Sequence, residues 1–207
     1  MDARFITLEG IEGCGKTTQL DFVVEYLQTR GIEVVKTREP GGTLVGERIR
    51  EILLDDELPA MQMDTELMLM FAARIEHVKT VIEPALEKNI WVVCDRFYDA
   101  TYAYQGYGRE IDLKRIDLLK QFSINNLVPD LTLLLDVTLE VSQQRVVQRG
   151  SKDRFENEKI EFYQKVRAGY LEIASQHPQR VITLDATDSI QQVQLSIQEK
   201  LDDLISG

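Results

Sequence analysis

The residues best suited to chemistry lie near the start of the chain. The segment Gly10-Ile11-Glu12-Gly13-Cys14-Gly15-Lys16-Thr17 matches the phosphate-binding pattern GxxxxGK[ST], known as a P-loop. Its glycines let the backbone wrap a polyphosphate, and its lysine bridges the β and γ oxygens. A glycine-rich turn that only caps a helix would account for the glycines but gives no reason for Lys16. We therefore expect the segment to bind ATP through Gly10, Ile11, Glu12, Gly13, Cys14, Gly15, Lys16, Thr17 and Thr18.

A second chemical signal is the pair Asp95-Arg96, which follows the apolar run 90–94. At the carboxyl end of a strand an aspartate can hold Mg²⁺ directly or through water, and an arginine can clamp a phosphate. Thr17 is expected to place its hydroxyl on the same Mg²⁺. An ordinary ion pair at the strand end is the alternative interpretation. The sequence contains neither the guanine-specifying NKxD motif nor a DxxG motif at Asp95, which argues against a GTPase switch.

Strands and helices must position these residues, and the hydrophobic pattern predicts where those elements lie. Short apolar runs alternate with segments of helical period, which is typical of a parallel sheet covered by helices on both faces. We predict an α/β fold of the P-loop NTPase type with a five-stranded parallel sheet. The strands are expected at about 4–9, 32–36, 90–95, 131–136 and 180–184. The helices are expected at about 16–29, 44–54, 64–87, 112–124, 139–148, 156–175 and 189–205.

Composition limits the possible partners. The 207 residues suit one domain, and 24 Lys and Arg against 35 Asp and Glu give a net charge of −11. This charge argues against a nucleic-acid or anionic-membrane binder, because such proteins usually present a positive surface. Two cysteines are too few for a disulfide framework, and the sequence shows neither a secretory signal nor a run of apolar residues as long as a membrane span. We expect a cytoplasmic protein with no nucleic-acid or membrane partner.

Two segments exceed the simple alternation of strands and helices. The stretch at about 40–88 is longer than one crossover between strands requires, so we expect it to contain a substrate-binding flap. The loop 148–154 is short, polar and charged, and we expect it to move. With Arg145, its basic residues suit a lid that closes over a transferring phosphate, although a solvated charge cluster would look the same.

Several motifs together resemble those of the thymidylate kinases. In the order found in that family, the chain carries Thr37-Arg38-Glu39-Pro40-Gly41-Gly42-Thr43, Phe71-Ala72-Ala73-Arg74, Asp95-Arg96-Phe97, Thr101-Tyr102-Ala103-Tyr104-Gln105-Gly106 and Asp153-Arg154-Phe155-Glu156. The resemblance implies a single kinase domain over 1–207, with a nucleoside-monophosphate-binding insertion at about 38–70 and a lid at about 146–156. It also implies the reaction ATP + dTMP → ADP + dTDP, with Mg²⁺, in a homodimer.

The resemblance assigns roles to residues at matching positions. Phe71 is expected to stack on thymine, Arg74, Thr101 and Gln105 to read its polar edge, and Tyr104 to lie under the deoxyribose. Arg96 is expected to hold the dTMP phosphate, with Arg38 and Arg50 as helpers. Glu9 is expected to serve Mg²⁺ together with Thr17 and Asp95. The residue types alone allow other interpretations. Phe71 could lie in a hydrophobic core, Arg74 could lie on a solvated helix surface, and the tyrosines could be ordinary packing residues.

The same resemblance places a catalytic arginine in the lid. Family members carry this arginine either in the P-loop or in the lid, and the P-loop position here is Glu12. Arg149 and Arg154 are therefore the expected catalytic lid residues, alongside Lys16 and Arg96. Phe97 departs from the family, where many members have tyrosine or histidine after Asp-Arg. Cys14 is open to a second interpretation as an oxidation-sensitive thiol.

Two other functions stay open on the sequence alone. One is a kinase for another nucleotide or for a deoxynucleoside, and the other is a nucleotide-dependent switch or binding module. The products formed from ATP and a panel of nucleosides and monophosphates would separate them, because a switch phosphorylates no acceptor.

Overall fold

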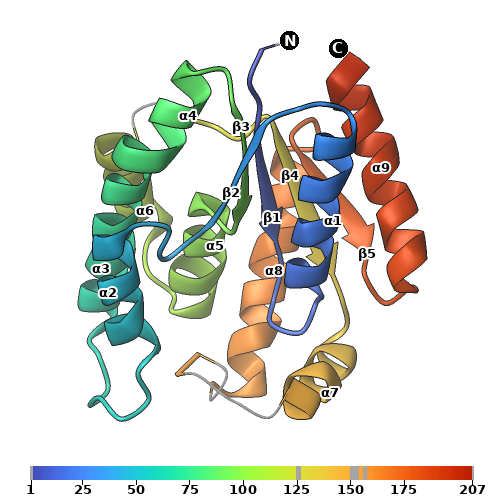
Figure 1. The fold of residues 1–207 in the computed structure, drawn as a ribbon. Helices are drawn as coiled ribbons and strands as arrows, with labels where there is room; N and C mark the ends of the chain where they lie inside the picture. Colours follow the sequence, from blue (N-terminus) through green and yellow to red (C-terminus); the bar gives the residue numbers. More distant parts are fainter. Residues whose placement is uncertain (1, 125–126, 150–153, 156–157, 207) are drawn as a thin grey trace.

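A parallel sheet of five strands forms the centre of the molecule in a computed structural model, which describes residues 2–124, 127–149, 154–155 and 158–206 (Figure 1). The strands are β1 (Phe5–Glu9), β2 (Val34–Arg38), β3 (Trp91–Asp95), β4 (Leu131–Asp136) and β5 (Val181–Asp185). Their order across the sheet is β2-β3-β1-β4-β5. The predicted five-stranded parallel sheet is confirmed, and each strand lies within two residues of its expected position.

The central strands are apolar on both faces because helices cover both faces. The side chains of β1 are buried throughout, with Ile6 and Leu8 on one face and Phe5, Thr7 and Glu9 on the other. Thr7 lies beside Thr132 of β4, and their hydroxyls are 2.7 Å apart. Each buried hydroxyl therefore has a partner inside the sheet.

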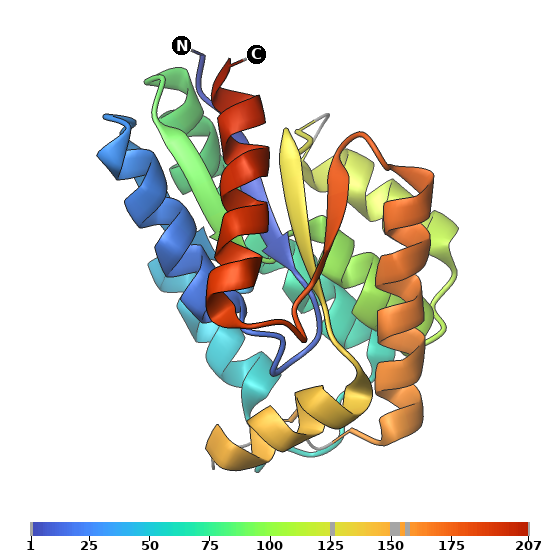
Figure 2. The ribbon, with the colours of Figure 1, turned by 90° about the vertical axis from the view of Figure 1, so that its right-hand side faces the viewer.

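The helices form two layers around the sheet. They are α1 (Lys16–Thr29), α2 (Leu44–Leu54), α3 (Met63–His77), α4 (Glu83–Glu87), α5 (Tyr98–Thr101), α6 (Leu113–Ile124), α7 (Leu139–Arg149), α8 (Ile160–Gln176) and α9 (Ile190–Ser206). Two π-helical segments are η1 (Val78–Ile82) and η2 (Tyr102–Gly108). Figure 2 shows α1 and α9 on one face of the sheet and α8 on the other. No helix in the described ranges is both long and apolar enough to cross a membrane.

Two helical regions differ in detail from the sequence prediction. The helix expected at 64–87 is present, but it consists of α3, η1 and α4, with Pro84 in the first turn of α4. Pro84 has no N–H to donate to the preceding turn, so the helical hydrogen bonds are interrupted where η1 meets α4. Residues 98–108, for which no helix was predicted, form α5 and η2. This segment is rich in tyrosine and glycine, so its helical structure depends on packing against α8.

The strand order brings the two chemical signals together. β1 and β3 are neighbours, and Leu8 of β1 is in register with Asp95 of β3. The P-loop after β1 and Arg96 after β3 therefore leave the same edge of the sheet. Strand order changes direction at β1, and ligands bind at such a switch point in open α/β sheets.

Candidate active site

A cavity of about 480 Å³ opens at the carboxyl edge of β1 and β3. Its walls come from the P-loop, the ends of β2 and β3, and helices α2, α3, η2 and α7. Most of the predicted site residues line it, namely Glu12, Gly13, Gly15, Lys16, Thr17, Thr18, Arg38, Arg50, Arg74, Asp95, Arg96, Thr101, Tyr104 and Gln105. Six of the predicted residues whose side chains the structure describes are not among its lining: Glu9, Gly10, Ile11, Cys14, Phe71 and Arg154.

The P-loop wraps tightly around the start of α1. The ammonium of Lys16 donates to the carbonyls of Gly10 at 2.9 Å and Ile11 at 3.0 Å, so the lysine lies across the loop. Gly13 has φ 71°, and a Cβ there would lie 2.5 Å from the carbonyl oxygen of Ser142 in α7. Only glycine fits this position. The Ser142 hydroxyl donates to the Glu12 carbonyl at 2.8 Å, which fixes the loop to α7.

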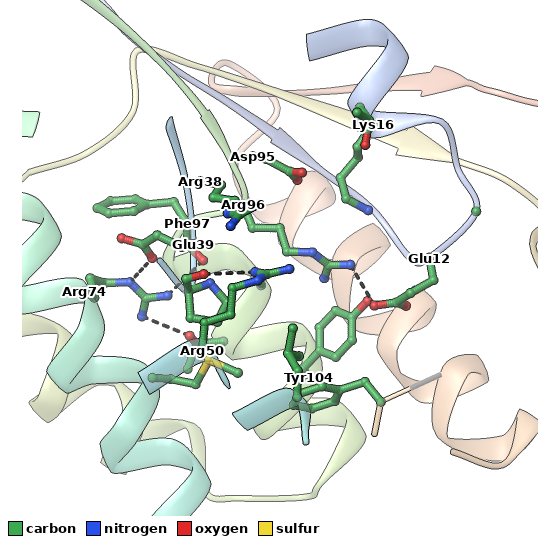
Figure 3. Close-up of a pocket in the computed structure, with 18 of the residues that line it drawn as sticks. Glu12, Lys16, Arg38, Glu39, Arg50, Arg74, Asp95, Arg96, Phe97 and Tyr104 are labelled. Carbon is green, nitrogen blue, oxygen red and sulfur yellow. Dashed lines mark hydrogen bonds and ion pairs between the residues drawn. The ribbon is translucent and has the colours of Figure 1, made fainter. Parts of the chain in front are cut away.

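Arg96 has an unusual backbone that directs its side chain into the cavity. Its φ is 67°, a left-handed conformation that costs a non-glycine residue free energy. The guanidinium donates to Glu12 Oε1 at 2.8 Å and lies 4.6 Å from the ring centre of Tyr104 (Figure 3). The Tyr104 hydroxyl donates to Glu12 Oε2 at 2.7 Å. Burial raises the pKa of Glu12, but the charges of Arg96 and Lys16 outweigh it and leave that pKa below its usual value.

Two further arginines surround the same end of the cavity. Arg38 at the end of β2 is half exposed and pairs with Glu47 at 2.7 Å. Arg50 of α2 donates to the carbonyl of Pro40 at 2.9 Å. Burial lowers the pKa of Arg50, and the nearby charges of Arg38 and Arg96 lower it further. A bound anion would relieve this repulsion between like charges, so the arrangement suits a phosphate group.

The other end of the cavity carries the buried ion pair of Arg74 and Glu39 together with neutral polar groups. Arg74 donates to Glu39 at 2.6 Å, to the Thr101 hydroxyl at 2.9 Å and to the Phe97 carbonyl at 3.2 Å (Figure 3). A guanidinium has five N–H donors, so these contacts do not use them all. Gln105 is buried beside it. Such donors and acceptors in a mostly enclosed wall suit the polar edge of a nucleobase.

Phe71 is placed differently from the expectation. Its ring is 2% exposed and packs with Leu67, Ile111 and Ile116 in a hydrophobic cluster outside the cavity. The preceding residue, Met70, lines the cavity in its place. Neighbouring residues on a helix point about 100° apart, so only one of the two can face a ligand there. The Phe71 ring supports the site from behind, 5.1 Å below the Arg74 guanidinium.

The acidic residues expected at Mg²⁺ also divide into two kinds. Asp95 lines the cavity, and its Oδ1 is buried with no hydrogen-bond partner among the described residues. An unpaired buried carboxylate oxygen in a cavity that Thr17 also lines fits a cation or its water shell. Glu9 lies outside the lining and accepts from the Phe97 N–H at 2.7 Å and the Tyr170 hydroxyl at 2.8 Å. Burial, with the charge of Asp99, raises the pKa of Glu9 to about 8, and both of its carboxylate oxygens already accept a hydrogen bond.

The basic lid residues are only partly described. The side chain of Arg149 and all of Lys152 fall outside the described part of the chain. Arg154 donates to Glu66 at 2.7 Å and to the Leu53 carbonyl at 2.8 Å, outside the cavity. Arg145, which the sequence suggested only as part of the basic cluster, lines the cavity and donates to the carbonyls of Gly13 at 3.3 Å and Ala186 at 3.1 Å.

Other residues of the site gave little signal in the sequence. Glu39 holds both Arg74 and His77, and the second ring nitrogen of His77 lies 2.6 Å from the Thr37 hydroxyl. Glu39 and Thr37 belong to the motif 37–43, where only the arginine had been given a role. His77 is therefore a structural residue.

Comparisons with known proteins match the chain to one family. The sequence profile of the family described as thymidylate kinase matches residues 8–197. A thymidylate kinase from Ectopseudomonas mendocina is 51% identical over 207 residues, covering 100% of this chain and 99% of the relative. One from Chromohalobacter salexigens is 52% identical, covering 99% and 97%.

A solved structure gives the same result in three dimensions. The crystal structure of thymidylate kinase from Ehrlichia chaffeensis superposes with a TM-score of 0.79 and is 36% identical. The match covers 97% of this chain and 99% of that one. The profile, the relatives and the fold all agree over almost the whole chain, and the chain belongs to the thymidylate kinase family.

Proposed function

We propose that this chain transfers the γ-phosphoryl group of ATP to dTMP and releases ADP and dTDP. The observation that carries the proposal is a single cavity that joins the P-loop lysine, an arginine cluster and a polar wall suited to a base edge. The dTMP phosphate would bind Arg96, with Arg38 and Arg50 beside it. The base would lie against Arg74, Thr101 and Gln105.

Catalysis in this cavity would depend on alignment and neutralisation of charge. The acceptor is a phosphate oxygen that is already anionic at neutral pH, so no strong general base is needed. Lys16 would exchange its two backbone carbonyl partners for the β and γ oxygens of ATP. Arg96, fixed by Glu12 and Tyr104, would keep the acceptor phosphate in line with the γ-phosphoryl group. Arg149 and Arg154 remain the proposed lid residues, and Arg154 would have to leave Glu66 to reach a phosphate.

The apolar wall of the acceptor site is assigned to Met70 rather than to Phe71. A methionine side chain is flexible and polarisable, so it can cover the flat face of a base. Tyr104 would support the deoxyribose from its position beside Arg96. At the ATP end, Arg145 lies between the P-loop and the loop after β5, where the adenine would bind.

A divalent cation, Mg²⁺, would neutralise charge on the ATP phosphates when bound. Thr17 and Asp95 are the residues proposed to hold it, and Asp95 brings a buried oxygen without another partner among the described residues. No group of three or more His, Cys, Asp or Glu suited to a metal occurs in the described ranges. Two protein ligands suffice for a cation that keeps several waters and binds phosphate.

A homodimer is proposed on the basis of an exposed apolar surface. The neighbouring helices α2, α3 and α6 stand together at one side of the molecule (Figure 1), and each exposes large apolar side chains. Phe122 of α6 is 80% exposed, with Leu118 one turn before it and Met68 exposed on α3. Large apolar side chains exposed together on neighbouring helices suit an interface. We also propose a cytoplasmic location, since both cysteines are buried and unpaired.

The test is direct product analysis. The purified chain is incubated with ATP, Mg²⁺ and one acceptor at a time from dTMP, dUMP, dCMP, dGMP and thymidine, and the nucleotides are separated by chromatography. The proposal expects dTDP and ADP in equal amounts, with dTMP the preferred acceptor. ADP release without a phosphorylated acceptor would indicate a switch or an ATPase, and phosphorylation of thymidine alone would indicate a nucleoside kinase.

A further inference from the structure

One carboxylate outside the cavity contacts three residues from two other parts of the chain. Glu66 of α3 is 1% exposed. Its Oε1 accepts from the Gln105 amide nitrogen at 2.9 Å, and its Oε2 accepts from Arg154 at 2.7 Å. Arg109 at the end of η2 donates to both oxygens at 3.3 Å. No role followed for Glu66 from the sequence or from the proposed reaction.

The contact with Glu66 determines which way the Gln105 amide points. A side-chain amide has a donor nitrogen on one side and an acceptor oxygen on the other. A carboxylate that is ion-paired to two arginines offers only acceptor atoms, so the amide nitrogen must face it. The Gln105 side chain also lines the cavity, which leaves its oxygen as the atom for a ligand.

An amide oxygen in this position selects between bases. Thymine and uracil carry a hydrogen-bond donor at N3, whereas cytosine carries an unprotonated acceptor there. An oxygen facing cytosine N3 would bring two acceptors together and leave both without a partner, which lowers affinity. If the amide were reversed, its N–H₂ would donate to cytosine N3. It would face the N3–H of thymine donor against donor, so the site would then favour cytosine.

We propose that Glu66 is a specificity-determining positioning residue, which fixes the Gln105 amide so that its oxygen receives the N3–H of thymine. The inference rests on the proposed function, since it concerns the base of the same acceptor. Glu66 itself touches no substrate. Arg109 and Arg154 pair with Glu66 and offset the cost of burying its charge.

The decisive variant is Glu66→Gln, which keeps the size of the side chain but offers both a donor and an acceptor. Gln105 is then free to reverse. We expect the ratio of kcat/KM for dTMP over dCMP to fall by about tenfold, the loss expected when one hydrogen bond no longer discriminates. The ratio of dTMP over dUMP should stay the same, because the two bases share N3–H and O4.

The control is Arg109→Gln, which removes one ion pair from Glu66 but leaves its contact with Gln105. This variant should keep the dTMP/dCMP ratio within about twofold of the original even where stability or kcat falls. The variant Gln105→Met should lower the ratio as Glu66→Gln does, and the double variant should show no further loss. If Glu66→Gln does not fold, Glu66→Asp takes its place, because the shorter side chain cannot hold the amide at the same distance.

The outcomes separate the inference from the proposed function. Unchanged dTMP/dCMP ratios in a folded Glu66→Gln or Glu66→Asp variant would overturn the role of Glu66 while the original chain still phosphorylates dTMP. An equal fall in the ratio in Arg109→Gln would also overturn it, since the effect would then come from loss of packing. Failure of the original chain to phosphorylate dTMP would contradict the proposed function itself.

Discussion

Arg96 and Glu12 form an ion pair of 2.8 Å that links the end of β3 to the P-loop across the cavity. The pair holds the arginine where the P-loop and the acceptor phosphate meet. Because Arg96 adopts φ 67°, the backbone bears a cost to place this one side chain. A left-handed backbone at a non-glycine residue persists only when the surrounding structure fixes it, and it is often found at functional sites.

Replacing Arg96 should separate function from stability. Arg96→Ala and Arg96→Gly both remove the guanidinium, so both should lower kcat/KM for dTMP by about a hundredfold or more. Glycine adopts a left-handed backbone without strain, so Arg96→Gly should be more stable than Arg96→Ala by about 1 kcal/mol. Steady-state kinetics and urea unfolding measure the two effects. Near-original kcat/KM in either folded variant would remove Arg96 from the phosphate site.

Met70 and Phe71 should respond differently to truncation. Met70→Ala removes the cavity wall, so the KM for dTMP should rise several-fold with little change in the free energy of unfolding. Phe71→Ala empties a core position and should cost about 3–5 kcal/mol of stability. Kinetics and urea unfolding of both variants test this assignment. If the KM for dTMP rises more in a folded Phe71→Leu variant than in Met70→Ala, then Phe71 and not Met70 contacts the base.

The buried carboxyl of Glu9 should make stability depend on pH. Its pKa is raised to about 8, so the folded chain holds a proton that the unfolded chain loses near pH 4.5. The free energy of unfolding should therefore decrease as pH rises between these values, by at most about 1.4 kcal/mol per pH unit. Glu9→Gln keeps an uncharged acceptor for the Phe97 N–H and should lose this slope. Urea unfolding at a series of pH values measures it, and parallel curves for the two proteins would contradict the prediction.

The exposed surface of α6 should hold two copies together. Phe122→Glu places a charge on the most exposed apolar side chain of α6, so it should shift the chain from dimer to monomer at micromolar concentration. Sedimentation velocity measures the change. Leu171→Glu, at a partly exposed apolar position on α8, is the control and should leave the dimer intact. A dimer that persists with both Phe122→Glu and Leu118→Glu would place the interface elsewhere.

The sequence predicted the sheet well because buried parallel strands are nearly continuous apolar runs. The stretches that became β3 and β4 needed no other information. Residues 98–108 were missed because a tyrosine- and glycine-rich segment has little helix propensity, and its structure comes from packing against α8. Local pattern therefore predicts elements that are consistent with their own propensities.

The site was harder to predict where it depends on the rotation of a helix or on distant contacts. The motif Phe71-Ala72-Ala73-Arg74 indicated the correct turn of α3, but only the packing of that helix shows that Met70 faces the cavity. Glu66 has partners at positions 105, 109 and 154, so no local motif could reveal it. The P-loop was predictable because its chemistry is contained in consecutive residues.

The most direct test of the whole account follows the γ-phosphoryl group itself. The original chain and Lys16→Ala are each given ATP labelled in the γ-phosphoryl group together with dTMP and Mg²⁺, and circular dichroism checks that the variant is folded. We expect the label to appear in dTDP with the original chain, and at a rate lower by a factor on the order of hundreds or more with Lys16→Ala. Label found only in inorganic phosphate, or equal rates for the two proteins, would contradict the account.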